Sequence, residues 1–302
     1  RKISYSTFGI LDTDIRGKTK MIQQGNPPFI IIRDGKVVPL ACSVRTENRW
    51  DDRVFSYSEF ECAFGDRIVF FSDGISQAGI GTREHPLGWG DEKICEFLEE
   101  IISFQPDISA KDLCNLLLEE AVRKDGGTAG DDITCAVAYY RKPRKLLVLT
   151  GPPYDMSTDR DYAMLAERHD GRVAICGGTT SNIVARELGR DLSMDLTDLD
   201  PEIPTTSEMP GVSLVTEGCL TLGKAAELLE SGMDCGRVNG ATRLVDHFLE
   251  SDIIRFVVGT RINEAHQNPE LPVELEIRRN VVKKIARLLE EKYLKETSIE
   301  FV

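Results

Sequence analysis

The chain has 302 residues, of which 41% are hydrophobic, and its formal net charge is -13 at pH 7. At about 100 to 200 residues per domain, this length accommodates two ordinary hydrophobic cores. The strong negative charge argues against nucleic acid or an anionic membrane as a partner, because both select basic surfaces. No apolar stretch approaches the ~20 residues that a bilayer span requires, so we expect no membrane-embedded segment in this sequence.

The first apolar strand that carries chemistry is predicted at residues 68–71, within the segment R-I-V-F-F-S-D-G. A short apolar run that ends in polar residues and glycine is typical of a buried strand. Asp73 is therefore expected at a strand end, with Gly74 forming a permissive turn. A plain turn without any metal is the alternative, because Asp-Gly is a common way to leave a strand.

Two amphipathic helices are predicted next, with a capping box formed by Ser109 and Asp112 at the start of the second. Trp89, in L-G-W-G, is expected to fix the preceding loop in the core. The apolar faces of the two helices consist of Ile94, Phe97, Leu98, Ile101 and Ile102, and of Leu113, Leu116, Leu117 and Ala121.

A second strand, at residues 133–140, follows the glycine-rich segment G-G-T-A-G-D-D-I-T. Glycines without Cβ atoms allow Asp131 and Asp132 to approach a shared point. Two converging carboxylates are the oxygen ligands that Mg²⁺ or Mn²⁺ prefers, and such ions activate water for hydrolysis. A turn or a cap remains the alternative function of Asp131 and Asp132.

Together these motifs resemble the metal-dependent type 2C serine/threonine protein phosphatases, in the bacterial branch of stage II sporulation protein E. The resemblance covers residues 1 to about 141. It is carried by I-Q-Q-G-N-P-P-F-I-I-I-R-D-G-K-V at 22–37, F-F-S-D-G-I-S-Q-A-G at 70–79, P-L-G-W-G at 86–90 and G-D-D-I-T-C-A-V at 130–137.

The resemblance implies a fold, a reaction and a set of ligands. The fold is α+β, part of an α-β-β-α antiparallel sandwich. The reaction is hydrolysis of phosphoserine or phosphothreonine in a protein substrate, with two Mn²⁺ or Mg²⁺ ions in the complete domain. Asp73 and Asp131 take the place of metal ligands, and Gly74 and Asp132 are supporting residues.

One departure from the family pattern concerns the first half of such a domain, where the family has a further acidic residue and an Asp-Gly pair that bridges the metals. Residue 1 is Arg and the sequence begins within the strand meander, so we expect a fragment with a half-built site, weak metal binding and little turnover. Asp12 and Asp14 are candidate substitutes, but a turn role is favoured for them.

A basic, proline-broken stretch at residues 141–145 predicts a boundary between a first domain, 1–142, and a second, 143–302. Apolar strands are predicted at 146–151, 173–178, 212–218 and 253–260, each followed by a helix-like segment. Near-continuous apolar strands that alternate with helices indicate a three-layer α/β domain with a mainly parallel sheet.

The loop Gly177, Gly178, Thr179, Thr180 and Ser181 is the candidate anion or ligand site of the second domain, leading into a helix at 182–188. In open α/β sheets, ligands bind at the carboxyl ends of the strands, where helix N-termini present free N–H groups. An ordinary strand-to-helix turn, with residues 179–181 as N-caps, is the alternative. A ligand bound here would regulate the phosphatase.

A long helix beginning at Pro272 carries an apolar stripe, which packs on its own domain or forms a homodimer contact. The stripe comprises Ile277, Val281, Ile285, Leu288 and Leu289. Two hypotheses remain open at this point. The chain is part of a phosphoprotein phosphatase, or it is a non-catalytic phosphatase-like module whose second domain binds a small anion or a partner protein.

Cysteine and histidine spacing adds no further metal site. The cysteines show no C-x-x-C spacing and lie mostly within apolar runs, which favours buried reduced thiols and a cytoplasmic location. The histidines lack metal-ligand spacing. These residues are Cys42, Cys62, Cys95, Cys114, Cys135, Cys176, Cys219 and Cys235, and His85, His169, His247 and His266.

Overall fold

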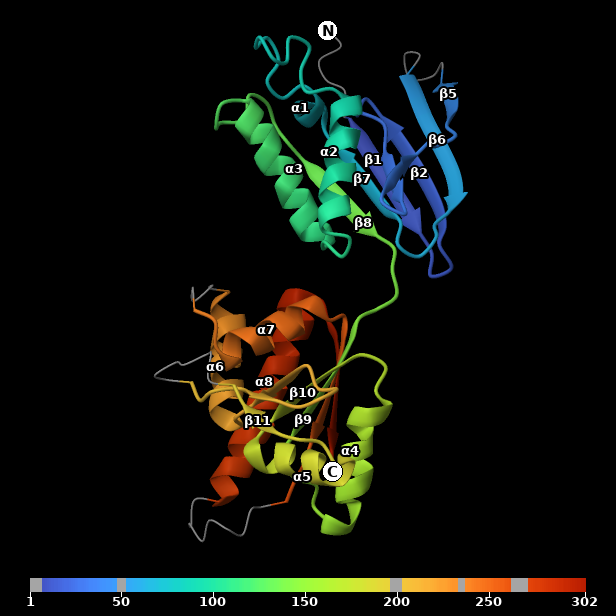
Figure 1. The fold of residues 1–302 in the computed structure, drawn as a ribbon. Coiled ribbons are helices and arrows are strands. Elements are labelled where there is room, and N and C mark those ends of the chain that lie inside the picture. Colours follow the sequence, from blue (N-terminus) through green and yellow to red (C-terminus); the bar gives the residue numbers. More distant parts are fainter. Residues whose placement is uncertain (1–6, 48–52, 196–202, 233–236, 262–270) are drawn as a thin grey trace. The chain divides into compact units, whose positions relative to one another are not determined.

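The computed structural model describes residues 7–47, 53–195, 203–232, 237–261 and 271–302, and it divides into two compact units, Arg1–Lys142 and Pro143–Val302 (Figure 1). We call them unit 1 and unit 2. Cys235 and His266 lie outside the described residues.

Unit 1 contains two antiparallel sheets of four strands each, which confirms the expected antiparallel sandwich. The first sheet has the order β1-β2-β6-β5 and the second has the order β4-β3-β7-β8. The strands of the first sheet are β1 (Phe8–Thr13), β2 (Lys18–Gln24), β6 (Arg53–Glu61) and β5 (Ser43–Glu47). Those of the second are β4 (Lys36–Val38), β3 (Ile30–Arg33), β7 (Arg67–Phe71) and β8 (Cys135–Tyr139).

Strand β7 joins the two cores of unit 1, because successive side chains of a strand point to opposite faces. Ile68 packs in the core that also contains Met21 and Phe29, whereas Val69 and Phe71 pack against helices. These helices are α1 (Asp73–Ser76), α2 (Asp91–Phe104) and α3 (Ala110–Lys124). The second sheet therefore has one face toward the first sheet and one face toward the helices.

The helices of unit 1 follow the predicted pattern closely. Trp89 is 3% exposed and packs edge-on against Phe97, with ring centroids 5.2 Å apart, so its predicted core position is confirmed. The Ser109 hydroxyl accepts the N–H of Asp112 at 3.0 Å, as a helix N-cap does. The Asp112 carboxylate accepts from the Ser109 hydroxyl at 2.6 Å. In a standard capping box this carboxylate would accept from the backbone N–H of the N-cap residue. Ile94, Leu98, Ile102, Leu113, Leu117 and Ala121 are the buried positions of the two faces.

Unit 2 is built on a seven-stranded sheet of order β11-β12-β13-β10-β9-β14-β15. The five strands from β13 to β15 run parallel, and β11 and β12 are antiparallel additions at one edge. The parallel strands are β13 (Leu214–Thr216), β10 (Arg172–Cys176), β9 (Lys145–Thr150), β14 (Ile253–Val258) and β15 (Glu296–Phe301); the additions are β11 (Ser193–Met194) and β12 (Ser207–Glu208).

Helices cover both faces of this sheet, which confirms the predicted three-layer α/β architecture. One face packs against α4 (Asp159–Arg168), preceded by the 3-10 turn η2 (Met156–Thr158), and against α5 (Gly178–Leu188). The other face packs against α6 (Cys219–Ser231), α7 (Gly240–Glu250) and α8 (Leu271–Tyr293). Figure 1 shows the sheet between these two helical layers.

The predicted stripe of the last helix is wrong at its first position. Ile277 is 45% exposed, whereas Val282, Ile285 and Leu289 are fully buried against the sheet. The spacing of these three residues places them on one line of the helix, and that line faces the core. None of the helices in the described ranges has both the length and the apolar character needed to cross a membrane.

Candidate functional site

Asp73 is the first residue of the one-turn helix α1 and not the last residue of a strand. Strand β7 ends at Phe71, and Ser72 occupies the N-cap position in an extended conformation. The Asp73 side chain is exposed, and its Oδ2 atom accepts a hydrogen bond from the Gln77 amide at 3.2 Å. The remaining carboxylate lone pairs face solvent, where they are accessible to a cation.

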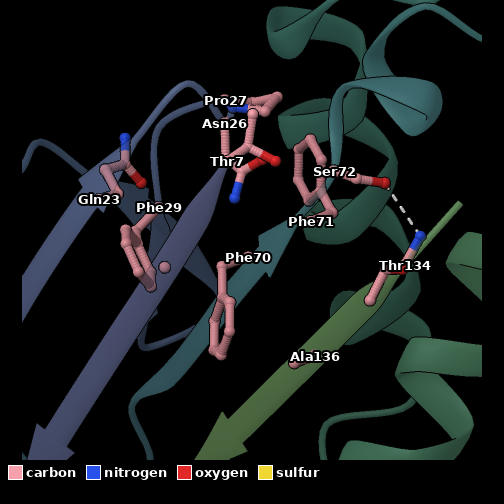
Figure 2. A pocket seen from close by; sticks show the side chains of 11 residues that line it. Thr7, Gln23, Asn26, Pro27, Phe29, Phe70, Phe71, Ser72, Thr134 and Ala136 are labelled. Carbon is pink, nitrogen blue, oxygen red and sulfur yellow. Dashed lines mark hydrogen bonds between the residues drawn. The ribbon is translucent and has the colours of Figure 1, made fainter. Parts of the chain in front are cut away.

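Ser72 joins the two aspartate motifs, which are about sixty positions apart in the sequence. Its N–H donates to the Thr134 carbonyl at 3.0 Å, and its hydroxyl accepts the Thr134 N–H at 3.0 Å. The same hydroxyl lies 3.1 Å from the Asp132 carbonyl, to which it donates. Figure 2 shows the Ser72–Thr134 contact at the ends of β7 and β8. The segments that carry Asp73 and Asp132 are thus fixed against each other.

Gly74 allows this approach for a reason different from the predicted turn. Its φ is not in the left-handed region, so backbone freedom is not what requires glycine here. A Cβ at this position would lie 2.7 Å from the Asp132 carbonyl oxygen and 3.1 Å from Ile133 Cγ2. Position 74 therefore has no room for a side chain while the two motifs are in contact.

Asp125 is a structural residue of this region that the sequence analysis missed. Its carboxylate accepts the Gly79 N–H at 2.5 Å and the Gly130 N–H at 2.9 Å. It thereby ties the end of α3 to the loop after α1 and to the glycine-rich loop before Asp131. Its position between a predicted helix end and two glycines was the available signal.

Asp131 and Asp132 are both exposed, and Asp131 Oδ1 accepts the Asp132 N–H at 2.8 Å. Within the described ranges, no three His, Cys, Asp or Glu side chains gather in a way that would hold a metal ion. Asp73 and Asp131 offer oxygen donors alone, which suits Mg²⁺ or Mn²⁺, but they are fewer than such an ion coordinates. Asp14 has the favoured turn role, because its carboxylate accepts the N–H groups of Arg16 and Lys18.

A pocket of about 260 Å³ lies beside the joined motifs, between the two sheets of unit 1. Ser72, Thr134, Gln23 and Asn26 are among its polar lining residues, and Phe70 is among the apolar ones (Figure 2). The pocket is thus lined by both apolar and polar side chains, next to the segment that carries Asp73.

In unit 2, the candidate loop is part of a helix. Gly177 is the N-cap of α5, and the helix begins at Gly178, four residues before the predicted start. The predicted helix start at residue 182 is therefore wrong, and so is the alternative in which residues 179–181 act as N-caps. The cause is a tertiary hydrogen bond, since the Gly177 N–H donates to the Thr216 carbonyl of strand β13 at 2.9 Å and so fixes the residue that precedes the first turn.

Comparisons with known proteins agree with the motifs of unit 1. A family model described as Stage II sporulation protein E (SpoIIE) matches residues 4–141. None of the curated proteins matches the sequence.

Solved structures with similar folds include the phosphatase domain of SpoIIE from Bacillus subtilis, at 22% identity and a TM-score of 0.36, covering 46% of this chain and 60% of that one. The Mn-presoaked form of that domain has 22% identity and a TM-score of 0.37, with coverage of 46% and 57%. The RsbU and RsbW domains of Rv1364c from Mycobacterium tuberculosis have 20% identity and a TM-score of 0.38, with coverage of 53% and 43%. This chain thus spans less than two thirds of each of these relatives.

The family match covers the same stretch in which the aspartate motifs, the glycine loop and the strand meander were found. Over residues 4–141, the chain is similar to the Stage II sporulation protein E family, which confirms the resemblance drawn from its motifs.

Proposed function

We propose that unit 1 takes part in metal-dependent hydrolysis of phosphoserine or phosphothreonine in a protein substrate. Asp73 and Asp131 are the proposed ligands of Mn²⁺ or Mg²⁺, and Gly74 and Asp132 support them. The observation that carries the proposal is the set of Ser72 hydrogen bonds to residues 132 and 134, which brings the two aspartate segments together within a stretch similar to the SpoIIE family.

The residues of this chain would bind and orient the divalent ions, and the chemistry that these ions would supply is the activation of water near neutral pH. Gln77 holds one carboxylate oxygen of Asp73 in place. Asp125 restrains the glycine loop that presents Asp131. Because two carboxylates are an incomplete set for two ions, we propose that this chain binds metal weakly and turns over little substrate.

The test is Mn²⁺ binding by the full 302-residue chain, measured by electron paramagnetic resonance of the free ion. Removing one carboxylate ligand in Asp73→Asn or Asp131→Asn should weaken binding by about tenfold, since each ligand oxygen contributes charge directly to the ion. Asp34→Asn is the matched control, because Asp34 is exposed and lies in a β3–β4 turn at a φ of 49° that Asn tolerates equally. Equal affinity in both ligand variants and the control would rule out the ligand assignment.

A second candidate function is a non-catalytic phosphatase-like module, favoured because no three His, Cys, Asp or Glu side chains of the described residues gather to hold a metal ion. Hydrolysis of a phosphoserine peptide separates the two. A longer protein that completes the ligand set should show Mn²⁺-dependent turnover that either Asp→Asn variant abolishes. Failure to hydrolyse the peptide at saturating Mn²⁺ would favour the non-catalytic module.

Partners and location follow from the same proposal. Unit 1 acts on a phosphoprotein in the bacterial cytoplasm, and residues 143–302 form an accessory domain that regulates it. The net charge of -13 speaks against nucleic acid as a partner. The seven described cysteines are free thiols, with Cys62 and Cys176 buried and Cys42 exposed, in keeping with a reducing compartment. A homodimer through the exposed side of α8 remains a proposal.

A further inference from the structure

Each sheet of unit 1 ends in a strand that is paired on one side. Among the described strands, β1 lies at one edge of the first sheet and β8 at one edge of the second. The five residues of β8, C-A-V-A-Y, include neither a charged side chain nor a proline. Charges and prolines are what usually protect an edge strand from pairing, so this edge is suited to an extended peptide that adds a further strand.

The pocket of about 260 Å³ lies between these two edge strands, with Gly9 of β1 and Ala136 of β8 in its lining. The rings of Phe29 and Phe70 form an apolar wall, with their centroids 4.9 Å apart (Figure 2). A Cβ at position 9 would lie 3.3 Å from Phe29 Cζ and 3.8 Å from Phe70 Cδ2. The space beside the two rings is therefore open because residue 9 has no side chain.

Gln23 gives the pocket a polar group whose hydrogen bonds are not used. The residue is 9% exposed and belongs to the lining. Its side-chain nitrogen and oxygen have no hydrogen-bond partner among the described residues, and neither atom is sealed from solvent. Burying an amide without partners destabilises a fold, so the Gln23 amide has donor and acceptor capacity for a ligand. Asn26 contributes a second amide to the same lining.

The chemistry of the lining selects an uncharged ligand. Among the described residues, none of those that line the pocket carries a charge. An ionised group would lose its hydration there without gaining an opposite charge. Side-chain amides both donate and accept hydrogen bonds, as peptide groups do. The pocket is therefore matched to an apolar side chain that is attached to a peptide backbone.

Ser72 connects the pocket to the proposed metal site. It lines the pocket and directly precedes Asp73 in the chain. Consecutive Cα atoms are about 3.8 Å apart, and an extended peptide advances about 3.3 Å per residue. A peptide whose phosphorylated residue lies at Asp73 can thus place a residue a few positions away in the pocket.

We propose that this pocket binds an apolar side chain of the phosphoprotein substrate, a few residues from its phosphoserine or phosphothreonine, while the Gln23 amide hydrogen-bonds the peptide backbone. This role rests on the function proposed for unit 1 and adds a substrate preference to it. The preferred substrates are those in which an apolar residue, and not an acidic one, accompanies the phosphorylated residue.

The first test is saturation-transfer NMR of unphosphorylated peptides with the full 302-residue chain. EDTA is present, so the result does not depend on the metal site at Asp73 and Asp131. A peptide of alanine and glycine with one central leucine should bind about tenfold more tightly than the same peptide with alanine in its place, because the pocket buries the leucine side chain. Aspartate at that position should abolish binding.

Gln23→Leu and Gln24→Leu are a matched pair of variants, because the two residues are neighbours and are 9% and 8% exposed, but Gln24 is not part of the pocket lining. Gln23→Leu should weaken binding of the leucine peptide by about fivefold through the loss of a hydrogen bond. Its melting temperature should stay the same or rise, since an unpartnered amide is removed. Gln24→Leu should leave peptide binding unchanged.

The second test adds Mn²⁺ and phosphoserine peptides, with the leucine placed either within three residues of the phosphoserine or about eight residues away. The near position should bind more tightly. The proposal is overturned if leucine and alanine peptides bind equally in EDTA, if the two glutamine variants bind equally, or if the position of the leucine has no effect. Manganese binding by Asp73→Asn tells whether the metal site has failed instead, because that measurement involves no peptide.

Discussion

Replacing Gly74 by alanine tests whether contact between the two aspartate motifs holds this end of unit 1 together. The new Cβ would lie 2.7 Å from the Asp132 carbonyl oxygen, which is 0.7 Å short of the 3.4 Å at which ordinary contact begins. A backbone oxygen cannot rotate away as a flexible side chain can. The segment at residues 131–134 must therefore move.

The magnitude follows from what this movement disturbs. Overpacking a close contact costs about 1 to 3 kcal/mol. Displacement of the Asp132 carbonyl also breaks its 3.1 Å hydrogen bond with the Ser72 hydroxyl, which contributes about 1 kcal/mol. Alanine has a better helix propensity than glycine, which offsets about 0.5 to 1 kcal/mol of this loss at a position inside α1. The net expectation is a loss of about 2 kcal/mol in the free energy of unfolding.

Urea unfolding followed by tryptophan fluorescence isolates the effect in unit 1, because both tryptophans of the chain, Trp50 and Trp89, belong to it. Gly130→Ala is the matched control in the same region, since its Cβ would meet the nearest atom, Asp125 Oδ2, at 3.7 Å. We expect a change of about 0.5 kcal/mol or less for the control. Equal unfolding free energies for Gly74→Ala and Gly130→Ala would refute the argument from close approach.

Two further predictions concern charged groups of unit 1, with the same fluorescence assay. Hydrogen bonds from Arg123, supported by Lys124, lower the pKa of Glu120 from 4.5 to about 2. The stabilisation by this ion pair is therefore complete above about pH 4.5 and is lost as the pH falls toward 2. Glu120→Gln should lower the unfolding free energy by about 1 kcal/mol at pH 7, a value reduced because Arg123 is 72% exposed. Near pH 2 the same substitution should leave the unfolding free energy unchanged. A difference that persists unchanged at pH 2 would contradict this assignment. Asp66 is 1% exposed and accepts from Arg33 at 2.6 and 2.9 Å and from the Ala63 N–H at 2.8 Å. Asp66→Asn should lower the unfolding free energy by about 2 kcal/mol, because the buried carboxylate loses its ion pair with the half-exposed Arg33 and part of its hydrogen bonding; a loss under about 1 kcal/mol would show that this pair is dispensable.

Much of the local structure was predictable because it depends on neighbours in the sequence. The Ser109 cap of α3, the buried faces of α2 and α3, and the four apolar strands of unit 2 all appear where the patterns indicated them. Strand β15 was not predicted, because its residues Glu296–Phe301 are largely polar and exposed at a sheet edge. An edge strand has one partner and needs little apolar surface, so its sequence carries a weak signal.

The candidate sites also combine features that the sequence predicted with features that only the folded structure shows. The sequence by itself determined the α/β alternation of unit 2 and the residue types of both candidate sites, because periodicity, capping and turn chemistry are local. The antiparallel sandwich of unit 1 was expected from the resemblance of its motifs to a known family. Only the tertiary structure decided that Gly74 meets Asp132, that Asp125 ties two loops together and that α5 begins at Gly178. Each of these depends on a contact between segments far apart in the chain, and the geometry of such a contact is fixed by how strands and helices pack, which no local pattern specifies.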